Sequence, residues 1–469
     1  TGAMRCHVER THAQLIDSRG YIEHDPEEIY GNVITLARQL LEQSRVSPGD
    51  VLAVGLTNQR ETALAWYRDT GKPACNAIVW QCARGETLCE RLRGQGVEES
   101  VRTRTGLHLS PYFSAAKWAW MLENIEGLRE QAERGDVLLG TMDSYLLYRL
   151  TDGCEFRTDA SNAARTQLLN LHTLSWDEEL LRLFGIPARC MARLTDSDGA
   201  FGETDFCGVL PRKIPIRCVM GDSNASLFGH GCLARGMMKA SYGTGSSIMM
   251  NVGEAPVMSR EGLVTSLAWK QNGRVQYVLE GNVNYVGAVI TWLKDDLGLL
   301  QNAAESETLA RSANPQDRTY LVPAFSGLGA PYWRSDVSAA FVGMSRTTGS
   351  KELVRAGLSS IAYQVEDVVR LMRREAGVDA LELHADSGAS RNGYLMQLQS
   401  DLLGFPVLVS DNQAMTGMGV AFGAGLAISL YTPDVFAQNR YRCYTPTMDE
   451  KTRAEQYEGW QTAVRTVMR

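Results

Sequence analysis

The sequence lacks several features that would place it in a common class of protein. Its ten cysteines form no CxxC pair and no regular framework, so we expect free thiols and predict no metal site. Its formal net charge is -7 and its lysines and arginines are scattered, so we expect no nucleic-acid partner. Its most apolar stretch, residues 417–431, is shorter than the roughly 20 residues of a membrane span and predicts a buried helix.

Other absences narrow the enzyme class and the location. No Walker A motif with its Gly-Lys-Ser or Gly-Lys-Thr ending is present, which argues against a P-loop NTPase. No predicted strand is followed by GxGxxG and a later acidic residue, which argues against a Rossmann dehydrogenase. No secretory signal opens the sequence. We therefore expect a cytoplasmic protein with no membrane partner.

The length and the pattern of apolar residues predict an α/β protein with two domains. A chain of 469 residues exceeds what one hydrophobic core usually organises, so a cleft between two domains is expected. Short β-branched runs alternate with longer amphipathic stretches, which is typical of α/β domains. The predicted domains are residues 1–229 and 230–469. Strands are predicted at 51–56, 77–80, 214–220, 239–242, 275–279, 320–322 and 381–384, and helices at 26–44, 113–124, 287–297, 350–375 and 393–403.

Two charged motifs follow predicted strands. Arg60 and Glu61 place a guanidinium beside a carboxylate, either as a surface ion pair or as a clamp on vicinal hydroxyls. Asp222 follows an apolar strand and a glycine, where a carboxylate is either a helix cap or the base that phosphoryl transfer to an alcohol requires. These residues alone leave both pairs of alternatives open.

Two glycine-containing loops in the second half are candidate phosphate sites. The turn at Gly243, Thr244 and Gly245 could cradle phosphate oxygens, although taken alone it favours a hairpin turn. The segment 386–392 precedes a predicted helix and could bind a nucleotide or only cap that helix. We therefore expect the substrate mainly on the first domain and the nucleotide mainly on the second.

In this order the motifs resemble the FGGY carbohydrate kinases, most closely the glycerol kinases, from Gly20 to the C-terminus. The matching segments are 55–62, 76–81, 112–124, 221–229, 242–245, 323–333 and 397–401. The resemblance implies a two-domain fold like actin, hexokinase and the Hsp70 ATPase, of the ribonuclease H-like type, with a cleft that closes over both ligands. It also implies an ATP-dependent kinase for a terminal hydroxyl of a small polyol, with Mg²⁺ carried on the nucleotide phosphates.

The resemblance also implies roles for individual residues. Asp222 corresponds to the catalytic base. The implied polyol-binding residues are Arg60, Glu61, Trp80, Tyr112, Asp222, Ser223 and Ser247. The implied nucleotide-binding residues are Thr1, Arg5, Thr244, Gly287, Thr291, Gly388 and Asn392.

Several positions depart from the glycerol kinase pattern. Ser223 stands where glutamine is usual and Ser247 where an aromatic residue is common, which would widen the pocket for a four- or five-carbon polyol as an alternative to glycerol. Cys82 replaces an acidic residue and is expected to be a structural, neutral thiol. Residues 208–213 lack the Gly-Gly-Thr-Arg run of a sugar-bisphosphate effector loop, so that feedback inhibition is not expected.

The first residues match the family only in part. Thr1 to Arg5 resemble the second half of an Asp-x-Gly-Thr phosphate turn, but the aspartate and part of a hairpin before Gly20 are missing. Either the sequence omits segments or the protein is truncated, and truncation would impair the positioning of Mg·ATP.

Two other functions stay open. A ketose kinase of the xylulose or ribulose type is one, although Arg60, Glu61 and Tyr112 favour a polyol. A catalytically silent protein that binds a nucleotide and a metabolite is the other, although the presence of Asp222 argues against it. We expect a homodimer, because symmetric dimers are the commonest soluble oligomers.

Overall fold

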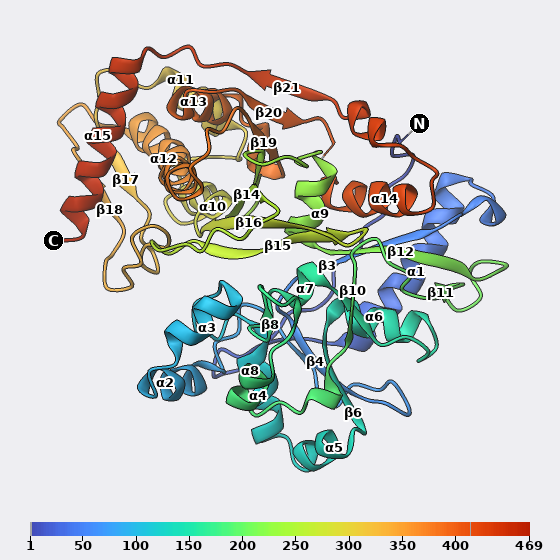
Figure 1. The fold of residues 1–469 in the computed structure, drawn as a ribbon. Helices are drawn as coiled ribbons and strands as arrows, with labels where there is room; N and C mark the ends of the chain where they lie inside the picture. The colour runs from blue at the N-terminus through green and yellow to red at the C-terminus, as the bar shows by residue number, and fades with distance from the viewer. Residues whose placement is uncertain (1, 413) are drawn as a thin grey trace.

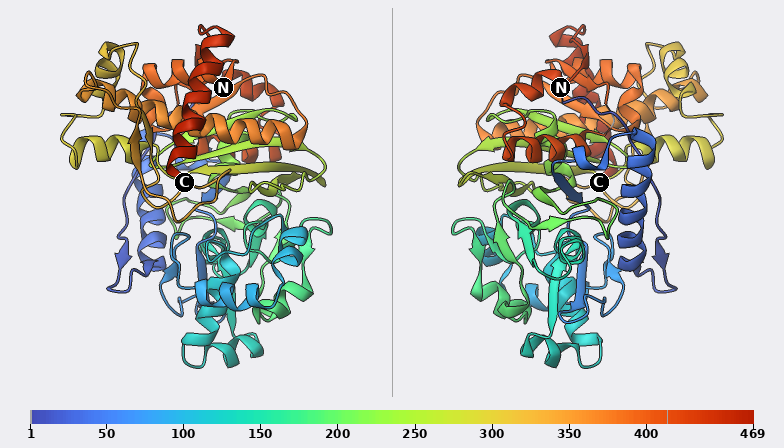
Figure 2. Two further views of the ribbon diagram at one scale, coloured as in Figure 1. Left: turned by 90° about the vertical axis from the view of Figure 1, so that its left-hand side faces the viewer. Right: turned by 90° about the vertical axis from the view of Figure 1, so that its right-hand side faces the viewer.

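The computed structural model describes residues 2–412 and 414–469. Its helices and strands form two lobes, one built mainly from the first half of the chain and one mainly from the second (Figure 1). Views turned by 90° show the second-half lobe, coloured green to red, above the teal first-half lobe (Figure 2). The architecture is α/β with two lobes, as predicted.

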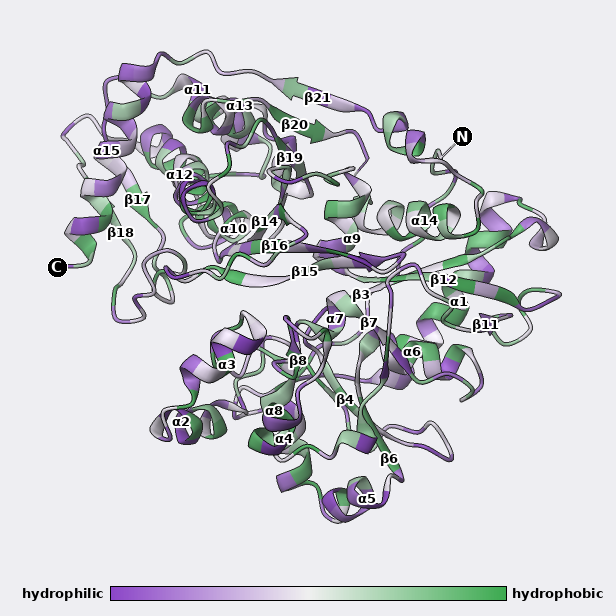
Figure 3. Cartoon of the chain, in the orientation of Figure 1, coloured by the Kyte–Doolittle hydropathy of each residue, from purple (hydrophilic) through white to green (hydrophobic). Residues whose placement is uncertain are grey.

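The core of the first lobe is a sheet with the strand order β1-β2-β5-β4-β6. Ala63 and Ala65 of β4 pack in one hydrophobic cluster with α2 and α4, while Leu64 and Trp66 pack in another with α6, so both faces are buried. Figure 3 accordingly shows β4 and β6 as mostly hydrophobic. The strands are β1 (Leu15–Ile16), β2 (Ile22–His24), β4 (Ala63–Tyr67), β5 (Ala77–Ile78) and β6 (Val137–Thr141), and the helices are α2 (Glu86–Gly94), α3 (Glu98–Thr105), α4 (Ser114–Asn124), α5 (Leu128–Arg134), α6 (Met142–Leu150) and α8 (Glu178–Phe184).

A smaller sheet with the order β11-β12-β3 adjoins this lobe. Its strands β12 and β3 run parallel with Gly221 opposite Asn58, so both end at the same edge. The sheet contains β3 (Val54–Asn58), β11 (Glu203–Thr204) and β12 (Ile214–Gly221), and the rest of the first half contains α1 (Pro26–Ser44), α7 (Ala160–Ala163), α9 (Asp222–Gly229) and the strand pairs β7 (Arg157–Asp159) with β10 (Arg193–Thr195) and β8 (Leu169–Asn170) with β9 (Ser175–Trp176).

The second lobe is built on a mixed sheet with the order β15-β16-β14-β13-β19-β20-β21. Strands β13, β19 and β20 are parallel, and the remaining pairs are antiparallel. The strands are β13 (Met238–Tyr242), β14 (Ser246–Gly253), β15 (Val264–Gln271), β16 (Arg274–Val283), β19 (Leu383–Asp386), β20 (Val407–Ser410) and β21 (Tyr441–Tyr444), with β17 (Tyr320–Val322) and β18 (Ala340–Val342) as a separate pair. The helices are α10 (Gly287–Asp295), α11 (Glu305–Ser312), α12 (Ser350–Ala376), α13 (Gly393–Leu403), α14 (Met415–Ala427) and α15 (Glu450–Val467).

Helix α12 covers one face of this sheet, and the other face is turned toward the first lobe. A Cβ atom at Gly281 of β16 would lie 2.5 Å from Val368 of α12. Because successive strand residues point to opposite faces, Glu280 points away from α12. An acidic side chain thereby lies between the two halves of the chain.

Helix α14 overlaps the segment 417–431 that the sequence predicts to be a buried helix, and it packs on both halves of the chain. A Cβ atom at Gly419 would lie 1.8 Å from the carbonyl oxygen of Ala225 in α9. A Cβ atom at Gly55 of β3 would lie 2.3 Å from the carbonyl oxygen of Val420. Helix α14 therefore fixes the position of α9, whose first residue is Asp222.

All ten cysteines are free thiols, as predicted. Within residues 2–412 and 414–469, no helix combines the length and the apolar character needed to span a bilayer.

Candidate active site

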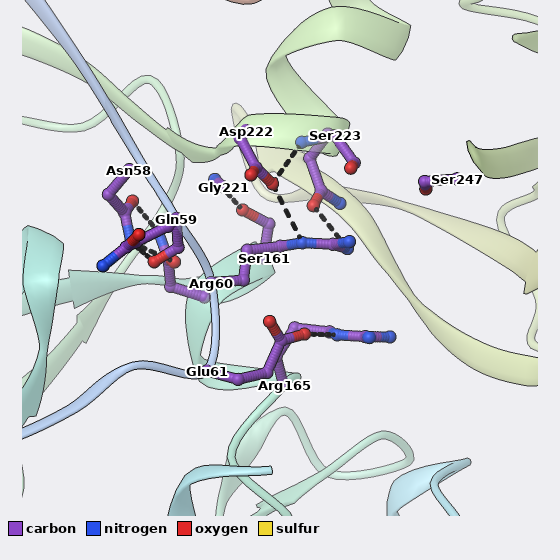
Figure 4. Close-up of polar contacts among 12 residues, drawn as sticks. Asn58, Gln59, Arg60, Glu61, Ser161, Arg165, Gly221, Asp222, Ser223 and Ser247 are labelled. Carbon is purple, nitrogen blue, oxygen red and sulfur yellow. Dashed lines mark hydrogen bonds and ion pairs between the residues drawn. The ribbon is translucent and has the colours of Figure 1, made fainter. Parts of the chain in front are cut away.

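Arg60 and Asp222 meet just beyond the ends of β3 and β12. Because these strands are parallel neighbours, the residues that follow them emerge side by side. Arg60 Nε lies 3.2 Å from Asp222 Oδ1, and the backbone amide of Ser223 donates to the same oxygen at 2.6 Å. The Asp222 side chain is 47% exposed, whereas that of Arg60 is only 5% exposed. Asp222 therefore presents an accessible carboxylate held from below by a buried cation (Figure 4).

Asp222 does not cap α9. The N-cap residue is Gly221, and Asp222 is the first residue of the helix. The amide of Gly221 donates to Ser161 Oγ at 3.0 Å, and Asn58 at the end of β3 exchanges hydrogen bonds with Asn162 at 2.9 and 3.0 Å. Helix α7 thereby holds both strand ends in place beneath the exposed carboxylate.

A buried chain of alternating charges extends from Asp222 into the interior. Arg60 donates to both carboxylate oxygens of Glu280 at 3.0 and 2.7 Å. Arg165 Nη1 lies 3.0 Å from the same carboxylate, and Arg165 Nε donates to Glu61. These four side chains are at most 5% exposed, and Arg60 and Glu61 have different ion-pair partners. The surface ion pair considered for Arg60 and Glu61 is therefore wrong.

Glu280 is the centre of this network. Burial by itself would raise the pKa of Glu280, but Arg165 and Arg60 outweigh it and hold that pKa well below its usual range. Ser247 Oγ donates to the same carboxylate at 3.1 Å. Because Glu280 and Ser247 belong to β16 and β14, whereas Arg60 and Arg165 belong to the first half, the network joins the two halves across the site.

The backbone at Glu61 is strained. Its φ of 60° lies in the left-handed region, and the amide of Thr62 donates to the carbonyl of Arg60 at 2.7 Å. A non-glycine residue at the centre of such a three-residue turn is uncommon and costs conformational energy. The turn sends the neighbouring side chains of Arg60 and Glu61 to separate partners.

Tyr112 and Phe113 lie on the loop that leads into α4, and Trp80 lies on the loop after β5. The rings of Trp80 and Tyr112 are 5.5 Å apart, and Phe113 lies 5.2 Å beneath the Arg165 guanidinium. Lys117 Nζ donates to the carbonyls of Pro111 at 2.8 Å and Phe113 at 3.1 Å, and also to that of Tyr112. Burial lowers the pKa of Lys117 to about 7, with Glu61 opposing the shift. Lys117 thereby fixes the loop that carries Tyr112.

In the second half, the loop of Thr244 lies against the start of α10. The residues 243–245 join the antiparallel strands β13 and β14, so the hairpin-turn interpretation is confirmed. The Thr244 carbonyl accepts from the amides of Val286 and Ala288 at 3.0 and 3.1 Å, and the Gly287 amide donates to Gly243 at 2.9 Å. Thr244 and Thr291 are both exposed. These contacts bring Thr244 and Gly287 together, with Thr291 one turn further along α10.

The loop after β19 emerges at the same sheet edge, because Ser241 of β13 lies opposite Asp386 of the parallel strand β19. Gly388 is exposed, and no heavy atom lies within 4 Å of where its Cβ would be. Asn392 caps α13 by accepting from the Leu395 amide at 2.9 Å, so the capping interpretation is confirmed. The open surface at Gly388 also leaves room for a nucleotide.

Asp386 connects this loop to the helix of Asp222. Its Oδ2 accepts from Ser226 Oγ at 2.7 Å and lies 3.1 Å from His230 Nε2. Ser226 belongs to α9, and His230 follows it directly. The loop of Gly388 and the helix of Asp222 are thus held by one buried carboxylate.

The predicted N-terminal nucleotide residues are not part of these contacts. Arg5 is exposed and lines a cavity of about 470 Å³ beside α1 and α14, where Leu40, Met418 and Phe422 also lie. Its side chain makes no hydrogen bond or ion pair to the described part of the chain. Thr1 lies outside the described residues. The roles of both residues stay predictions.

The structure also shows the surroundings of the residues that depart from the glycerol kinase pattern. Cys82 is buried, and its sulfur accepts from Ile22 N at 3.4 Å and Arg84 Nε at 3.1 Å, which fits the expected structural role. Ser223 and Ser247 are both partly exposed, and in the view of Figure 4 both lie above the Arg60 guanidinium.

Two models of one family match the chain. The model described as the FGGY family of carbohydrate kinases, N-terminal domain, matches residues 2–229, and its C-terminal counterpart matches residues 238–428. The chain belongs to the FGGY family of carbohydrate kinases. As an FGGY kinase it is a phosphotransferase with an alcohol group as acceptor, and the predicted family is confirmed. The domain boundary at residues 229 and 230 stays a prediction.

Individual FGGY kinases are similar over nearly the whole chain. "Glycerol kinase 1" of Thermotoga maritima is 46% identical over 97% of this chain and 93% of its own length, and the glycerol kinase of Carboxydothermus hydrogenoformans is 45% identical over 97% and 92%. The structure of Plasmodium falciparum glycerol kinase with ADP is similar with a TM-score of 0.92 at 30% identity, over 98% of this chain and 93% of that one. A xylulose kinase from Lactobacillus acidophilus has a TM-score of 0.89 at 20% identity, over 99% and 93%, which confirms the predicted fold class.

Arg165 and Glu280 were not predicted as site residues of this FGGY kinase. Arg165 is separated from Glu61 by 104 residues in the sequence, and Glu280 is separated from Arg60 by 220 residues. Glu280 is a charged residue that directly follows the apolar residues 277–279, and such a residue is seldom buried without a partner of opposite charge. That signal could have marked Glu280 as paired without naming its partners, whereas Arg165 lies among small and polar residues that give no such signal.

Proposed function

We propose that this FGGY kinase transfers the γ-phosphoryl group of ATP to a terminal hydroxyl of a small polyol, with Asp222 as the general base. The observation that carries the proposal is the half-exposed Asp222 carboxylate, held 3.2 Å from the buried Arg60 at the paired ends of β3 and β12. Phosphoryl transfer to an alcohol needs a carboxylate placed in this way near the accepting oxygen.

In the proposed reaction the hydroxyl proton moves to Asp222 as the oxygen attacks the γ-phosphorus. The new O–P bond forms while the bond to the departing ADP breaks, which leaves a phosphorylated polyol and a protonated Asp222. Arg60, Glu61 and Tyr112 bind the hydroxyl groups, and Trp80 packs on the carbon chain. The fixed positions of Arg60 and Glu61 support this role, because both are held in place before substrate arrives.

The nucleotide is proposed to lie along the loops of Thr244 and Gly388. Exposed Thr244 and Thr291, the α10 start at Gly287, and the open surface at Gly388 support this placement, with Asn392 at the start of α13. Mg²⁺ is bound through the nucleotide phosphates and supplies charge neutralisation when present. The ADP-bound state of the similar Plasmodium falciparum glycerol kinase supports ATP as the donor.

Glycerol is the substrate that the relatives support best, because the similar proteins from Thermotoga maritima and Carboxydothermus hydrogenoformans are glycerol kinases. A four- or five-carbon polyol is a second candidate, because Ser223 and Ser247 are small and polar beside Asp222 and Glu280. The cytoplasmic location and the homodimer stay predictions, and light scattering after size exclusion tests the dimer.

A substrate panel tests this function. Polyol-dependent ADP release would be measured with glycerol, erythritol, xylitol, ribitol and xylulose. We expect turnover of at least one polyol, and we expect Ser247→Phe to lower kcat/KM for xylitol relative to glycerol by about tenfold, because the ring fills space that only a longer substrate uses. Ser359→Ala, on α12, is the matched control and should leave that ratio unchanged. A chain that turns over xylulose better than every polyol, or that turns over none, would contradict the proposal.

A further inference from the structure

A cavity of about 620 Å³ lies in the second lobe and shares no residue with the candidate active site. Cavities of this volume are the usual size for small organic ligands. Its charged lining comes from the end of α12, the link that follows it and the start of α15, with Leu402 and Leu403 of α13 as an apolar part of the wall. The charged residues are Arg370, Arg373, Arg374, Arg453, Glu366 and Asp379.

The lining of this cavity, called here the arginine cavity, has an excess of positive charge in a chain whose net charge is -7. Arg370 donates to Glu366 through Nε, and Arg373 donates to Asp379 at 3.0 Å through one Nη. Arg374 pairs with Glu261 through one Nη. Since a guanidinium has five N–H donors, most of the guanidinium donors in the cavity have no partner among residues 2–412 and 414–469.

Arg453 differs from the other three arginines of the cavity in its contacts. Its side chain makes no hydrogen bond or ion pair to residues 2–412 or 414–469. It lies directly on the turn after α13, because a Cβ atom at Gly404 would be 2.1 Å from Arg453 Nη1. A glycine with φ of 74° ends α13 at this point and leaves room for the guanidinium.

Aromatic rings orient two of these arginines, and the protonation of Glu366 leaves part of the positive charge of the cavity unneutralised. The Arg370 guanidinium lies 3.9 Å from the centre of the Tyr457 ring, and that of Arg373 lies 5.9 Å from the centre of Phe405, so aromatic faces orient both. Burial raises the pKa of Glu366 to about 7, with Arg370 opposing the shift. Near neutral pH, Glu366 therefore cancels only part of the positive charge.

We infer that the arginine cavity binds a small metabolite with more than one phosphoryl group. One guanidinium group can donate hydrogen bonds to two phosphate oxygens at once. Four guanidinium groups therefore offer more donors than a single phosphate group can accept. The volume of about 620 Å³ exceeds that of one phosphate ion, so the site has room for a larger anion. The ligand site is separate from the proposed ATP site.

Inorganic pyrophosphate is the probe for this inference. Its binding would be measured by calorimetry with the protein saturated with ADP, so that the nucleotide loops are filled. We expect binding at one site, weakened about tenfold by Arg453→Gln and likewise by Arg374→Gln, because each variant removes a charge-assisted contact. Arg465→Gln, an exposed arginine on the same helix outside the cavity, is the matched control and should bind as the unaltered protein does.

Three outcomes would overturn the inference. The first is no pyrophosphate binding by the ADP-saturated protein. The second is binding that Arg453→Gln and Arg374→Gln leave unchanged while both variants retain the thermal unfolding of the unaltered protein. The third is binding of hexaglutamate without pyrophosphate binding, which would indicate an acidic protein partner for this surface.

Discussion

Ser387 adopts a backbone conformation that glycine tolerates far better than serine. Its φ of 74° and ψ of -179° lie in a region that is almost restricted to glycine and costs about 1–3 kcal/mol for other residues. The serine hydroxyl donates to Asp386 at 2.9 Å, and Asp386 in turn binds Ser226 of α9. The strained residue thus stands between the loop of Gly388 and the helix of Asp222.

Two substitutions of Ser387 distinguish the effect of the backbone strain on stability from the effect of the hydrogen bond to Asp386. Ser387→Ala loses the hydrogen bond and keeps the strain, whereas Ser387→Gly loses both. We expect the glycine variant to be more stable than the alanine variant by about 1 kcal/mol, after the greater flexibility of glycine in the unfolded chain is taken into account. Urea unfolding of the two variants measures this difference, and an alanine variant as stable as the glycine variant would show that position 387 is unstrained.

Single residues also mark the limit of prediction from the sequence. Asp222, Arg60 and Glu61 could be selected because each follows a predicted strand and carries charge. Glu280 could not be placed with them, because the contact depends on how β16 faces the first half of the chain. Arg165 could not be placed for the same reason.

At the scale of elements, the contact between α9 and α14 determines where Asp222 lies. The two helices approach so closely that each needs glycine at the contact. A Cβ atom at Gly229 of α9 would lie 2.5 Å from the Met415 carbonyl oxygen, and one at Gly419 would lie 1.8 Å from that of Ala225. Backbone atoms of a packed helix cannot move aside as a flexible side chain can.

Two alanine substitutions in α14 test this contact. We expect Gly419→Ala to lower the free energy of unfolding by about 3 kcal/mol or more, because the new methyl group overlaps the α9 backbone. Gly417→Ala, at an exposed position of the same helix with no atom within 4 Å, should raise it by up to about 1 kcal/mol through helix propensity. Denaturant unfolding measures both, and equal effects at the two positions would contradict the close packing.

Element bounds were predictable where local signals set them. Helices α1 and α13 have the predicted bounds, because Asp25 and Asn392 cap their first turns and Gly404 ends α13. Strand β16 extends from residue 274 to 283, beyond the predicted 275–279. The apolar run ends before the charged Glu280, and the strand continues through Glu280, whose charge is paired with Arg60 and Arg165. Tertiary pairing of this kind is absent from the local sequence.

At the scale of the whole molecule, Glu280 joins the two halves of the chain through charge. It is fully buried and pairs with Arg60 and Arg165, which both come from the first half. A buried charge that loses its partner is costly, because the remaining ion has neither water nor a counter-ion. The network therefore couples the stability of the protein to the geometry around Asp222.

Glu280→Gln tests this coupling with little change in shape. We expect the free energy of unfolding to fall by about 3–5 kcal/mol, because two buried guanidinium groups lose their shared counter-charge. Glu123→Gln breaks the exposed pair with Arg91 and is the control, with an expected loss below about 1 kcal/mol. Chemical denaturation compares the variants, and a Glu280→Gln effect as small as the control would show that the network does not hold the halves together.

Asp222 has the central role in the proposed reaction, as the base of a polyol kinase. The direct measurement is kcat for polyol-dependent ADP release by Asp222→Asn, together with the Kd for the polyol determined by calorimetry. If Asp222 has this role, we expect kcat to fall by about a hundredfold or more and the Kd to change only a few-fold, because asparagine keeps the shape and cannot take the proton. A variant that turns over the polyol as fast as the unaltered protein would contradict it.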